Sequence, residues 1–440
     1  MRTVGLIPLS LLAACGAPPF FARLPFEPEP SRYAPAPDKP IAVAAEERLA
    51  KPELTLDDVL LLVDAFNPEL RATRLEIDIA GAEAWDAGLY PNPVLEIEAE
   101  EVPTDGGLGD GKRVAGIRQD LPLSGRLGAA QDAKQAERDA AVERFRAARR
   151  RILMLAKAGF YEQRAAARRL ELLRRNAEIA ASLHKLVQDR FDNRAAPETD
   201  LLKASIERAL ADQEVRIAER ELDTAARALS ATVGRTDLRL DRLSGELHEE
   251  YEAVSHDAVK GEVTAGHPAL LAARADVRAA ELGIRQARAE AWPDLGVAIR
   301  AGRGEADDTI VEAAIEIPLP IFNRNQAEIQ AAELRAMRAA AHLDAATQEI
   351  LLGLRRAWVN YESALDRVRT YREEILPKAE KALAQSDEGY RAGEFAFLTV
   401  LDSQRTLADT QLAYLAARLD VERAAAALEE LIGRRLQAVR

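Results

Sequence analysis

The chain has 440 residues, a formal net charge of −13, one cysteine and an aromatic content of 5%. Its length leaves room for two or three ordinary domains, and its acidic balance argues against a general nucleic-acid-binding protein, so no nucleic acid is expected as a partner. The single cysteine excludes disulfide bonds within the chain and argues against a cysteine-based metal site.

Residues 1–14 have the features of a secretory signal. Arg2 precedes an apolar run at residues 4–12, which ends in the sequence Leu-Ala-Ala-Cys. A basic start, a short apolar core and small residues before a cleavage point are typical of an exported protein. The ending resembles a bacterial lipobox, which implies that Cys15 is lipidated and becomes the mature N-terminus. Within such signals, Gly16 after the cysteine implies that the lipoprotein is sent to the outer membrane, where outer-membrane lipid would be its partner. The alternative is a plain signal peptide with an incidental cysteine.

Residues 15–53 are rich in proline and lack periodicity, which predicts an extended linker. The fold is expected to begin near Leu54, where Thr55 can cap a helix and Asp58 lies three residues further on. No later apolar run reaches the roughly 18 residues that a membrane-spanning helix needs. Any membrane crossing by the mature chain is therefore expected to use a lipid anchor or β-strands.

From Leu54 onward the chain repeats itself at an offset of 200 residues, which becomes 199 after the long helices. This regularity predicts a tandem duplication of a helix–hairpin–helix–helix unit, with copies at residues 54–245 and 246–440. The matching pairs include Asn67 and His267, Pro93 and Pro293, Tyr161 and Tyr361, Phe191 and Tyr390, and Gly234 and Gly433.

Each copy contains a predicted β-hairpin, at residues 94–121 and 294–318. Apolar residues alternate with polar ones along the strands, and a turn rich in glycine and aspartate separates the two strands of each hairpin. Each hairpin should therefore have one apolar face and one acidic face. The carboxylates assigned to the acidic face are Glu96, Glu98, Glu100, Glu312 and Glu316.

A very long helix is predicted after each hairpin, over about residues 127–191 and 325–390. Some 65 residues at the helical rise span roughly 95 Å, far more than a typical globular helix. Pro377 is expected to kink or divide the second helix. Gly393 suits the left-handed stop that follows it, and Arg194 occupies the place of that glycine in the first copy.

No catalytic or metal-binding constellation is present in the sequence. The five histidines lack metal-ligand spacing, and there is no phosphate-binding loop, nucleophile elbow or dinucleotide fingerprint. Acidic pairs such as Asp307-Asp308 occur in turns or linkers, where solvated carboxylates are favoured over acid–base catalysis. The sequence therefore predicts a protein that is not an enzyme and has no cofactor.

The pattern of the two hairpins favours the interpretation that their strands cross a membrane. Four strands cannot stay open in lipid, because the N–H and C=O groups at their edges would lack partners, and they are too few to close a barrel. Several chains would have to share one barrel, with the acidic faces lining an aqueous lumen that favours cations. The alternative is a pair of soluble hairpins that cap a helical rod.

The duplication, the Asn67-Pro68-Glu69-Leu70 motif, the segment 88–93 and Leu121-Pro122-Leu123 resemble the TolC family of outer-membrane efflux proteins. The resemblance covers residues 54–433. It implies a mainly α fold with a small β part, in which duplicated long helices form a coiled-coil barrel. Two hairpins per chain would complete a twelve-stranded transmembrane β-barrel shared by a homotrimer. The likeness is greatest to the metal-efflux branch, the CzcC-like and CusC-like proteins.

The turn that follows the long helix of the second copy, around residues 390–402, resembles the periplasmic gate of the family. The resemblance implies that Tyr390, with Gly393 nearby, holds helix–helix contacts in the closed state, and that Asp402 contributes to a ring of three carboxylates. Phe395 and Thr399 stand where TolC has a gate-locking arginine and a first aspartate, so packing is expected to replace charge. The alternatives are a coiled-coil filler for Tyr390 and a solvated carboxylate for Asp402.

The resemblance implies a lipid-anchored outer-membrane channel that extends into the periplasm. It would passively conduct heavy-metal cations or drugs, delivered by an inner-membrane RND-type transporter and a periplasmic adaptor (membrane fusion) protein. Two alternatives stay open: the outer-membrane duct of a type I protein secretion system, and a periplasmic coiled-coil lipoprotein without a pore.

Overall fold

A computed structural model of the chain describes residues 39–100, 111–304 and 308–437. The predicted signal at residues 1–14, the lipidation site Cys15 and the first part of the predicted linker lie outside these residues. Among the described helices, none combines the length and the apolar character needed to cross a bilayer.

The described part is mainly helical with four strands, as the sequence predicts. From α2 onward the two halves follow the same order of two shorter helices, a hairpin, a long helix and a return helix, and α1 precedes this order in the first half. The first half contains α1 (Lys39–Leu49), α2 (Leu56–Phe66), α3 (Pro68–Asp86), β1 (Val94–Glu100), β2 (Lys112–Leu121), α4 (Arg126–Asp192) and α5 (Glu198–Val233). The second half contains α6 (His256–Gly266), α7 (Pro268–Ala289), β3 (Leu295–Arg303), β4 (Thr309–Glu316), α8 (Gln326–Thr370), the π-helical turn η3 (Tyr371–Ile375), α9 (Leu376–Ala392) and α10 (Phe397–Ile432).

Helix α1 lies in the stretch that was expected to be an extended linker, so that expectation is wrong for residues 39–49. Ala45 is fully buried in the core of the first half, and Arg48 donates a hydrogen bond of 2.9 Å to Asp58. Pro40 is compatible with a helix because it lies in the first turn, where backbone N–H groups have no partner within the helix. Proline content alone does not reveal this packing.

Side chains cap the first residues of three helices, and one of these caps was predicted. Thr55 and Asp58 form the expected capping box at the start of α2. Asn67 caps α3 and His267 caps α7, in each case with a proline at the next position. The repeated motif therefore has a structural role, because it starts the helix that leads to each hairpin.

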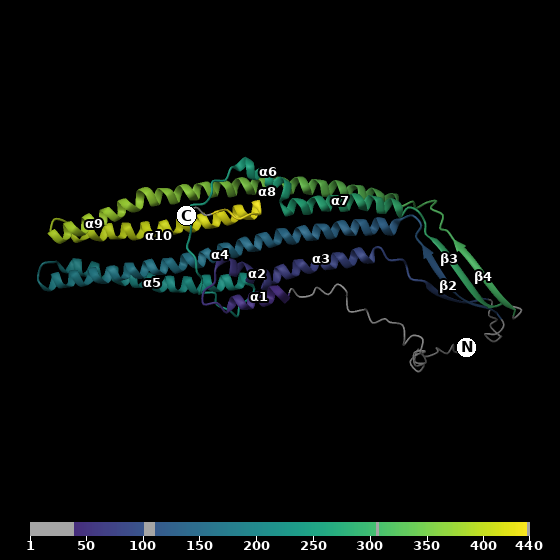
Figure 1. Cartoon of the computed structure of the whole chain (residues 1–440), viewed down its shortest axis with the longest axis horizontal. Coiled ribbons are helices and arrows are strands. Elements are labelled where there is room, and N and C mark those ends of the chain that lie inside the picture. The colour runs from purple at the N-terminus through teal and green to yellow at the C-terminus, as the bar shows by residue number, and fades with distance from the viewer. Residues whose placement is uncertain (1–38, 101–110, 305–307, 438–440) are drawn as a thin grey trace, which may run out of the picture. The chain divides into compact units, whose positions relative to one another are not determined.

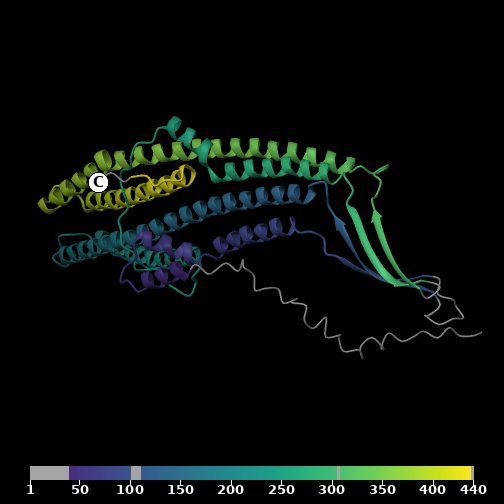
Figure 2. The same ribbon diagram turned by 45° about the vertical axis from the view of Figure 1, so that its right-hand side comes forward.

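Helices α3, α4, α7 and α8 pack in that order, each against the next (Figures 1 and 2). α4 has 67 residues and also packs against α5 and α10, so it contacts both halves of the chain. α5 returns along α4, and α10 returns along α8 and α9. The strands lie at one end of these helices, and the α4–α5 and α9–α10 turns lie at the other (Figure 1).

The four strands form one antiparallel sheet in the order β1-β2-β3-β4. β1–β2 and β3–β4 are the two predicted hairpins. β2 and β3 pair from Leu121 opposite Leu295 to Arg113 opposite Arg303, which joins the hairpins into one sheet. β1 and β4 are its edge strands.

Each half has its own buried core next to the linker between the halves. In the first half, Phe160 and Leu62 lie at its centre, and in the second, Tyr361 and Leu354 do. Many of the other buried positions are alanines, which let the long helices approach closely.

The two helix stops share one geometry. Gly393 has a φ of 81° and Arg194 a φ of 58°, so both adopt the left-handed conformation. Each stop has a backbone hydrogen bond across the turn, from Glu394 N–H to Gly389 C=O at 2.8 Å and from Ala195 N–H to Arg190 C=O at 2.7 Å. The long second helix is also divided as expected, with η3 directly before the turn that contains Pro377.

Candidate channel surfaces

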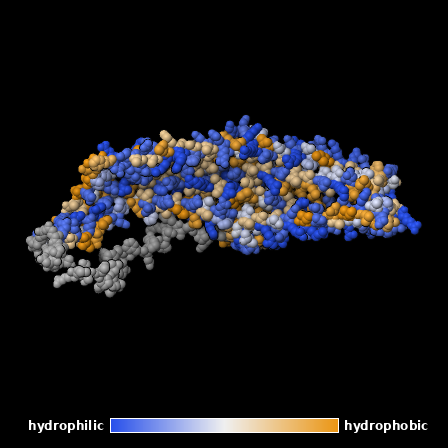
Figure 3. All heavy atoms as spheres, turned by 180° about the vertical axis from the view of Figure 1, so that it is seen from behind, coloured by the Kyte–Doolittle hydropathy of each residue, from blue (hydrophilic) through white to orange (hydrophobic). Residues whose placement is uncertain are grey.

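The register of the sheet gives it two chemically different faces. Residues paired directly across two strands share a face, so the alternation within each strand continues across the sheet. The side chains of the apolar face have exposed fractions between 58% and 79%. They are Leu95, Ile97, Ile117, Ile299, Val311 and Ile315. Figure 3 shows apolar side chains gathered at the strand end, and an exposed patch of this kind marks a contact surface.

The opposite face, called the charged face below, carries the five predicted glutamates, but it is not purely acidic as expected. Lys112, Arg118 and Arg300 lie on it as well. The Nζ of Lys112 lies 2.8 Å from a carboxylate oxygen of Glu312, and Nη2 of Arg300 lies 2.7 Å from Oε2 of Glu96. These cations join carboxylates on different strands, so the face combines paired charges with an acidic excess.

Gly116 on β2 makes room for the ion pair between Arg300 and Glu96, which crosses β2. A Cβ at this position would lie 2.6 Å from both Cα and Cγ of Arg300. Glycine therefore lets the Arg300 side chain pass over β2 and reach β1. Sequence analysis missed this network, although Lys112 and Arg118 are six residues apart on one strand and so must share a face.

Tyr390 packs at the end of the helices that is remote from the strands. Its side chain is 6% exposed and contacts a small core that includes Val187 and Phe397. The guanidinium carbon of Arg190 lies 4.6 Å from the centre of its ring, a cation–π contact. Tyr390 therefore connects α9 with α4 and α10, and with them the two halves of the chain.

The other residues predicted for the gate lie around the same turn. Gly393 ends α9, and the ring of Phe395 lies against Gly389, where a Cβ would come 2.6 Å from its Cε2. Asp402 is exposed on α10, one turn before Arg405. Arg405 pairs with Glu207 of α5, and that hydrogen bond raises the pKa of Arg405. The turn itself is thus held by packing, and Asp402 lies beside it with its carboxylate exposed.

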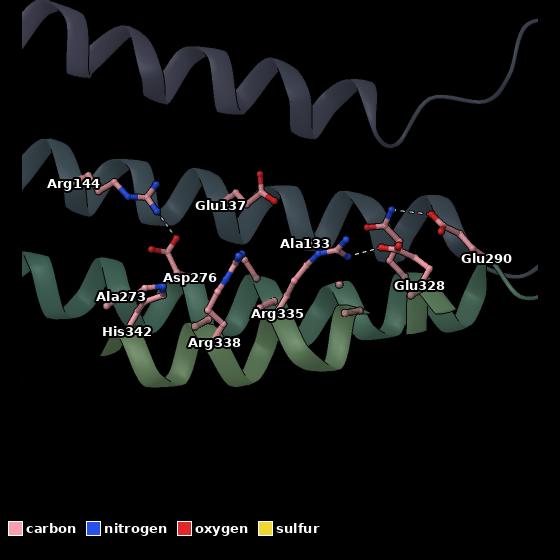
Figure 4. A pocket seen from close by; sticks show the side chains of 17 residues that line it. Ala133, Glu137, Arg144, Ala273, Asp276, Glu290, Glu328, Arg335, Arg338 and His342 are labelled. Atoms are coloured by element: carbon pink, nitrogen blue, oxygen red, sulfur yellow. Dashed lines mark hydrogen bonds and ion pairs between the residues drawn. The ribbon is translucent and has the colours of Figure 1, made fainter. Parts of the chain in front are cut away.

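A polar groove with a volume of about 710 Å³ lies along α4, α7 and α8 (Figure 4). Its floor is rich in alanine, and charged side chains rise on both sides. Arg144 of α4 pairs with Asp276 of α7, and Arg335 pairs with Glu328 within α8. Sequence analysis did not identify this groove, because its residues come from three helices far apart in the chain.

A buried charged cluster lies where the linker between the halves passes α10. Glu422 is fully buried and accepts hydrogen bonds from the backbone N–H of His248 at 2.7 Å and from the Tyr251 hydroxyl at 2.5 Å. The nearby Lys157 and Glu429 form an ion pair of 2.7 Å, with side chains 9% and 10% exposed. These contacts hold α4, the linker and α10 together. Sequence analysis missed them because nothing local in the sequence marks a charge as buried.

The comparisons with known proteins agree with this architecture. The family described as outer membrane efflux protein matches residues 62–235 and 260–434. The cobalt-zinc-cadmium resistance protein CzcC of Cupriavidus metallidurans is 28% identical over 396 residues, which cover 88% of this chain and 92% of that protein. The nickel-cobalt-cadmium resistance protein NccC of Alcaligenes xylosoxydans xylosoxydans is 26% identical, with 69% of each chain covered.

A solved structure of CusC has the same fold. It aligns with a TM-score of 0.71 and 19% identity, and the alignment covers 86% of this chain and 92% of that one. The predicted likeness to the metal-efflux branch is therefore confirmed. The family match spans most of both halves, so the chain belongs to the outer membrane efflux protein family, whose members are non-enzymatic conduits of the outer membrane.

Proposed function

We propose that the protein is the outer-membrane exit duct of a tripartite efflux system and works as a homotrimer. The observation that carries this proposal is the sheet, with its exposed apolar face and its opposite charged face. Its edge strands have no further partner strand among the described residues, and open edges are unfavourable in lipid. Pairing β4 of one copy with β1 of the next would close three sheets into a twelve-stranded barrel.

In this arrangement the apolar face meets lipid and the charged face lines the lumen. Glu96, Glu98, Glu100, Glu312 and Glu316 then face the substrate path, together with Lys112, Arg118 and Arg300. The acidic excess favours cations in this part of the pore, although less strongly than an all-acidic face would.

The helices continue the conduit into the periplasm. The groove along α4, α7 and α8 opens on one side of the helix layer. In the proposed ring of three copies this side faces the axis, and the groove lines the tunnel. Its exposed polar side chains, such as those of Arg338 and His342, then contact the passing substrate.

The helix end around Tyr390, Gly393 and Asp402 forms the periplasmic gate. Tyr390 holds helix–helix contacts there, and Asp402 of each copy contributes one carboxylate to a ring around the axis. The buried Tyr390 and the exposed Asp402 support these roles. Like charges brought together on an axis repel each other, so the ring binds cations and eases opening.

The N-terminal part anchors the protein to the outer membrane. The signal at residues 1–14 is removed, Cys15 is lipidated, and the residues up to 53 connect the lipid to the two copies of the unit at residues 54–245 and 246–440. Mass spectrometry of the mature N-terminal peptide tests this role, since an unmodified Cys15 would contradict it.

Heavy-metal cations are the substrate class that the metal-resistance relatives CzcC and NccC favour, with drugs as the second class. An inner-membrane RND-type pump selects and drives the export, and a periplasmic adaptor connects the pump to the duct. A type I protein secretion duct has the same fold, so the neighbouring pump gene and the export phenotype of a deletion strain separate these functions.

The first experiment is light scattering on detergent-extracted protein, followed by conductance in a planar bilayer. A trimer that requires detergent and conducts ions supports the pore. A monomer or dimer that stays soluble without detergent and does not conduct would leave the structural periplasmic lipoprotein as the function.

A further inference from the structure

Two arginines lie on the apolar face of the sheet. Arg113 of β2 and Arg303 of β3 are directly opposite each other in the register. They are on the same side as Ile117 and Ile299, because residues an even number of positions apart along a strand share a face. Within the described strands, these arginines are the only charged residues on that face.

The arginine pair occupies the end of the sheet that is remote from the helices. β2 leads into α4 at Leu121, α7 leads into β3 at Leu295, and these two leucines pair with each other. The arginines are eight residues further along each strand, a distance of about 26 Å. A tilted strand that crosses a bilayer needs about 9–11 residues. In the proposed barrel the leucine row therefore lies at the periplasmic boundary of the lipid, and the arginine row reaches the outer boundary.

Small side chains lie next to the pair. Ala115 and Ala301 form the neighbouring row toward the helices, and both are exposed. Arg303 is exposed and Arg113 is half-buried. The long aliphatic part of an arginine can lie on apolar surface while its guanidinium turns toward a polar boundary. The pair is therefore accessible from the side on which the apolar face meets lipid.

The charges of this row favour an anion at the outer boundary. Two cations directly opposite each other on neighbouring strands repel, and an anion that lies against both reduces this repulsion. A guanidinium binds phosphate oxygens through two parallel N–H groups. The apolar side chains of the same face suit the acyl chains of a lipid. The face thus combines contacts for a phosphate with contacts for hydrocarbon attached to it, which favours a lipid over a free phosphate.

We propose that Arg113 and Arg303 bind the phosphate groups of lipids in the outer leaflet of the outer membrane. The inference rests on the proposed barrel, because only there does the apolar face meet lipid. Each of the three chains contributes one arginine pair, so the pairs are spaced around the barrel. Bound lipid then fixes the depth of the strands in the membrane, since the arginines remain at the headgroups.

The test is native mass spectrometry of the detergent-extracted, full-length protein with added lipid A, an acylated glucosamine disaccharide that carries two phosphates. The same lipid after removal of its phosphates is the second probe, and inorganic phosphate is the third. We expect lipid A to bind several times more tightly than its dephosphorylated form. Inorganic phosphate at the same concentration should not displace it, because a free phosphate lacks the acyl chains.

Four variants locate the site. Arg113→Gln and Arg303→Gln should each weaken the binding of lipid A by about fivefold, and the double variant should weaken it further. Arg303→Lys keeps the positive charge and should retain most of the affinity. Lys112→Gln is the matched control, because Lys112 adjoins Arg113 in the chain but lies on the charged face. It should change the affinity by less than about twofold.

Equal binding of lipid A by the wild type and by the double variant would overturn the proposal. So would an equal loss in Lys112→Gln and Arg113→Gln, since general charge would then attract the lipid. The two forms of the lipid are compared on the wild type, so their equal binding overturns the proposal without any variant. If a double variant without lipid preference still conducts ions, only this inference fails. A wild-type chain that neither inserts into a bilayer nor conducts would overturn the proposed function as well.

Discussion

Arg300 on β3 and Glu96 on β1 form an ion pair across the strand that separates them, with Nη2 and Oε2 2.7 Å apart. The same guanidinium lies 3.8 Å from Glu98, so one cation holds two neighbouring positions of β1. This connection links the second hairpin to the far strand of the first. The four strands are therefore tied together on the charged face by side chains as well as by backbone pairing.

Gly116→Val should break this connection. The added atoms would meet both the backbone and the side chain of Arg300 at 2.6 Å, so β3 must shift and Arg300 must leave Glu96. We expect the heat stability of the detergent-extracted assembly to fall. Gly261→Ala in α6, where a Cβ meets nothing within 4 Å, is the control and should raise stability by about 0.5–1 kcal/mol. Equal behaviour of the two variants on a semi-denaturing gel would contradict the role of Gly116.

Arg194→Gly should stabilise the protein by about 1 kcal/mol, because a non-glycine residue at a positive φ is strained. The reverse change, Gly393→Arg at the matching stop of the second half, should destabilise it by a similar amount. Chemical denaturation of both variants measures the two effects. A loss of stability in Arg194→Gly would mean that the arginine side chain makes a contact worth more than the strain that it causes.

Much of this fold could be predicted because its signals are local and repeated. The hairpins, the long helices, the stop at Gly393 and the division near Pro377 each follow from a pattern within a few residues. The ion pairs of the charged face could not be predicted in this way. The strand alternation gave the face of each glutamate correctly, but the pairing of Arg300 with Glu96 depends on the register of β2 with β3, which no local pattern specifies.

Lys157→Met should destabilise the protein by about 3–5 kcal/mol, because it leaves the carboxylate of Glu429 buried without its cation. The double variant with Glu429→Gln should regain most of that loss. Arg423→Met breaks an exposed pair with Glu162, whose side chains are 48% and 43% exposed, and should cost less than about 1 kcal/mol. Urea unfolding of the wild type, the two single variants and the double variant measures the free energy that each ion pair contributes. An equal loss of stability in Lys157→Met and Arg423→Met would show that Lys157 is not buried in the assembly.

Asp402→Asn should reduce the preference of the reconstituted channel for cations, because it removes one carboxylate per chain from the proposed ring. Thr399→Asp, which adds a second carboxylate one turn before Asp402, should increase that preference. The measurement is the reversal potential in a potassium chloride gradient, with Asp257→Asn as a control at an exposed carboxylate on α6. An unchanged reversal potential in both gate variants would place Asp402 outside the conduction path.

The folded protein should lose stability as the pH falls from about 6.5 to about 4, and His267 should account for part of the loss. Burial and Arg150 lower its pKa from 6.5 to about 4, so the unfolded chain takes up a proton in this window while the folded chain does not. The stability that neutral His267 contributes is complete above pH 6.5 and disappears as the pH falls through 4. After allowance for solvent screening, the effect should be about 1–2 kcal/mol.

His267→Asn keeps a capping side chain, as Asn67 does in the first half, and should flatten this part of the stability curve. Parallel curves for the two proteins, measured by denaturant unfolding from pH 4 to pH 7, would show that His267 titrates normally and is not buried as described.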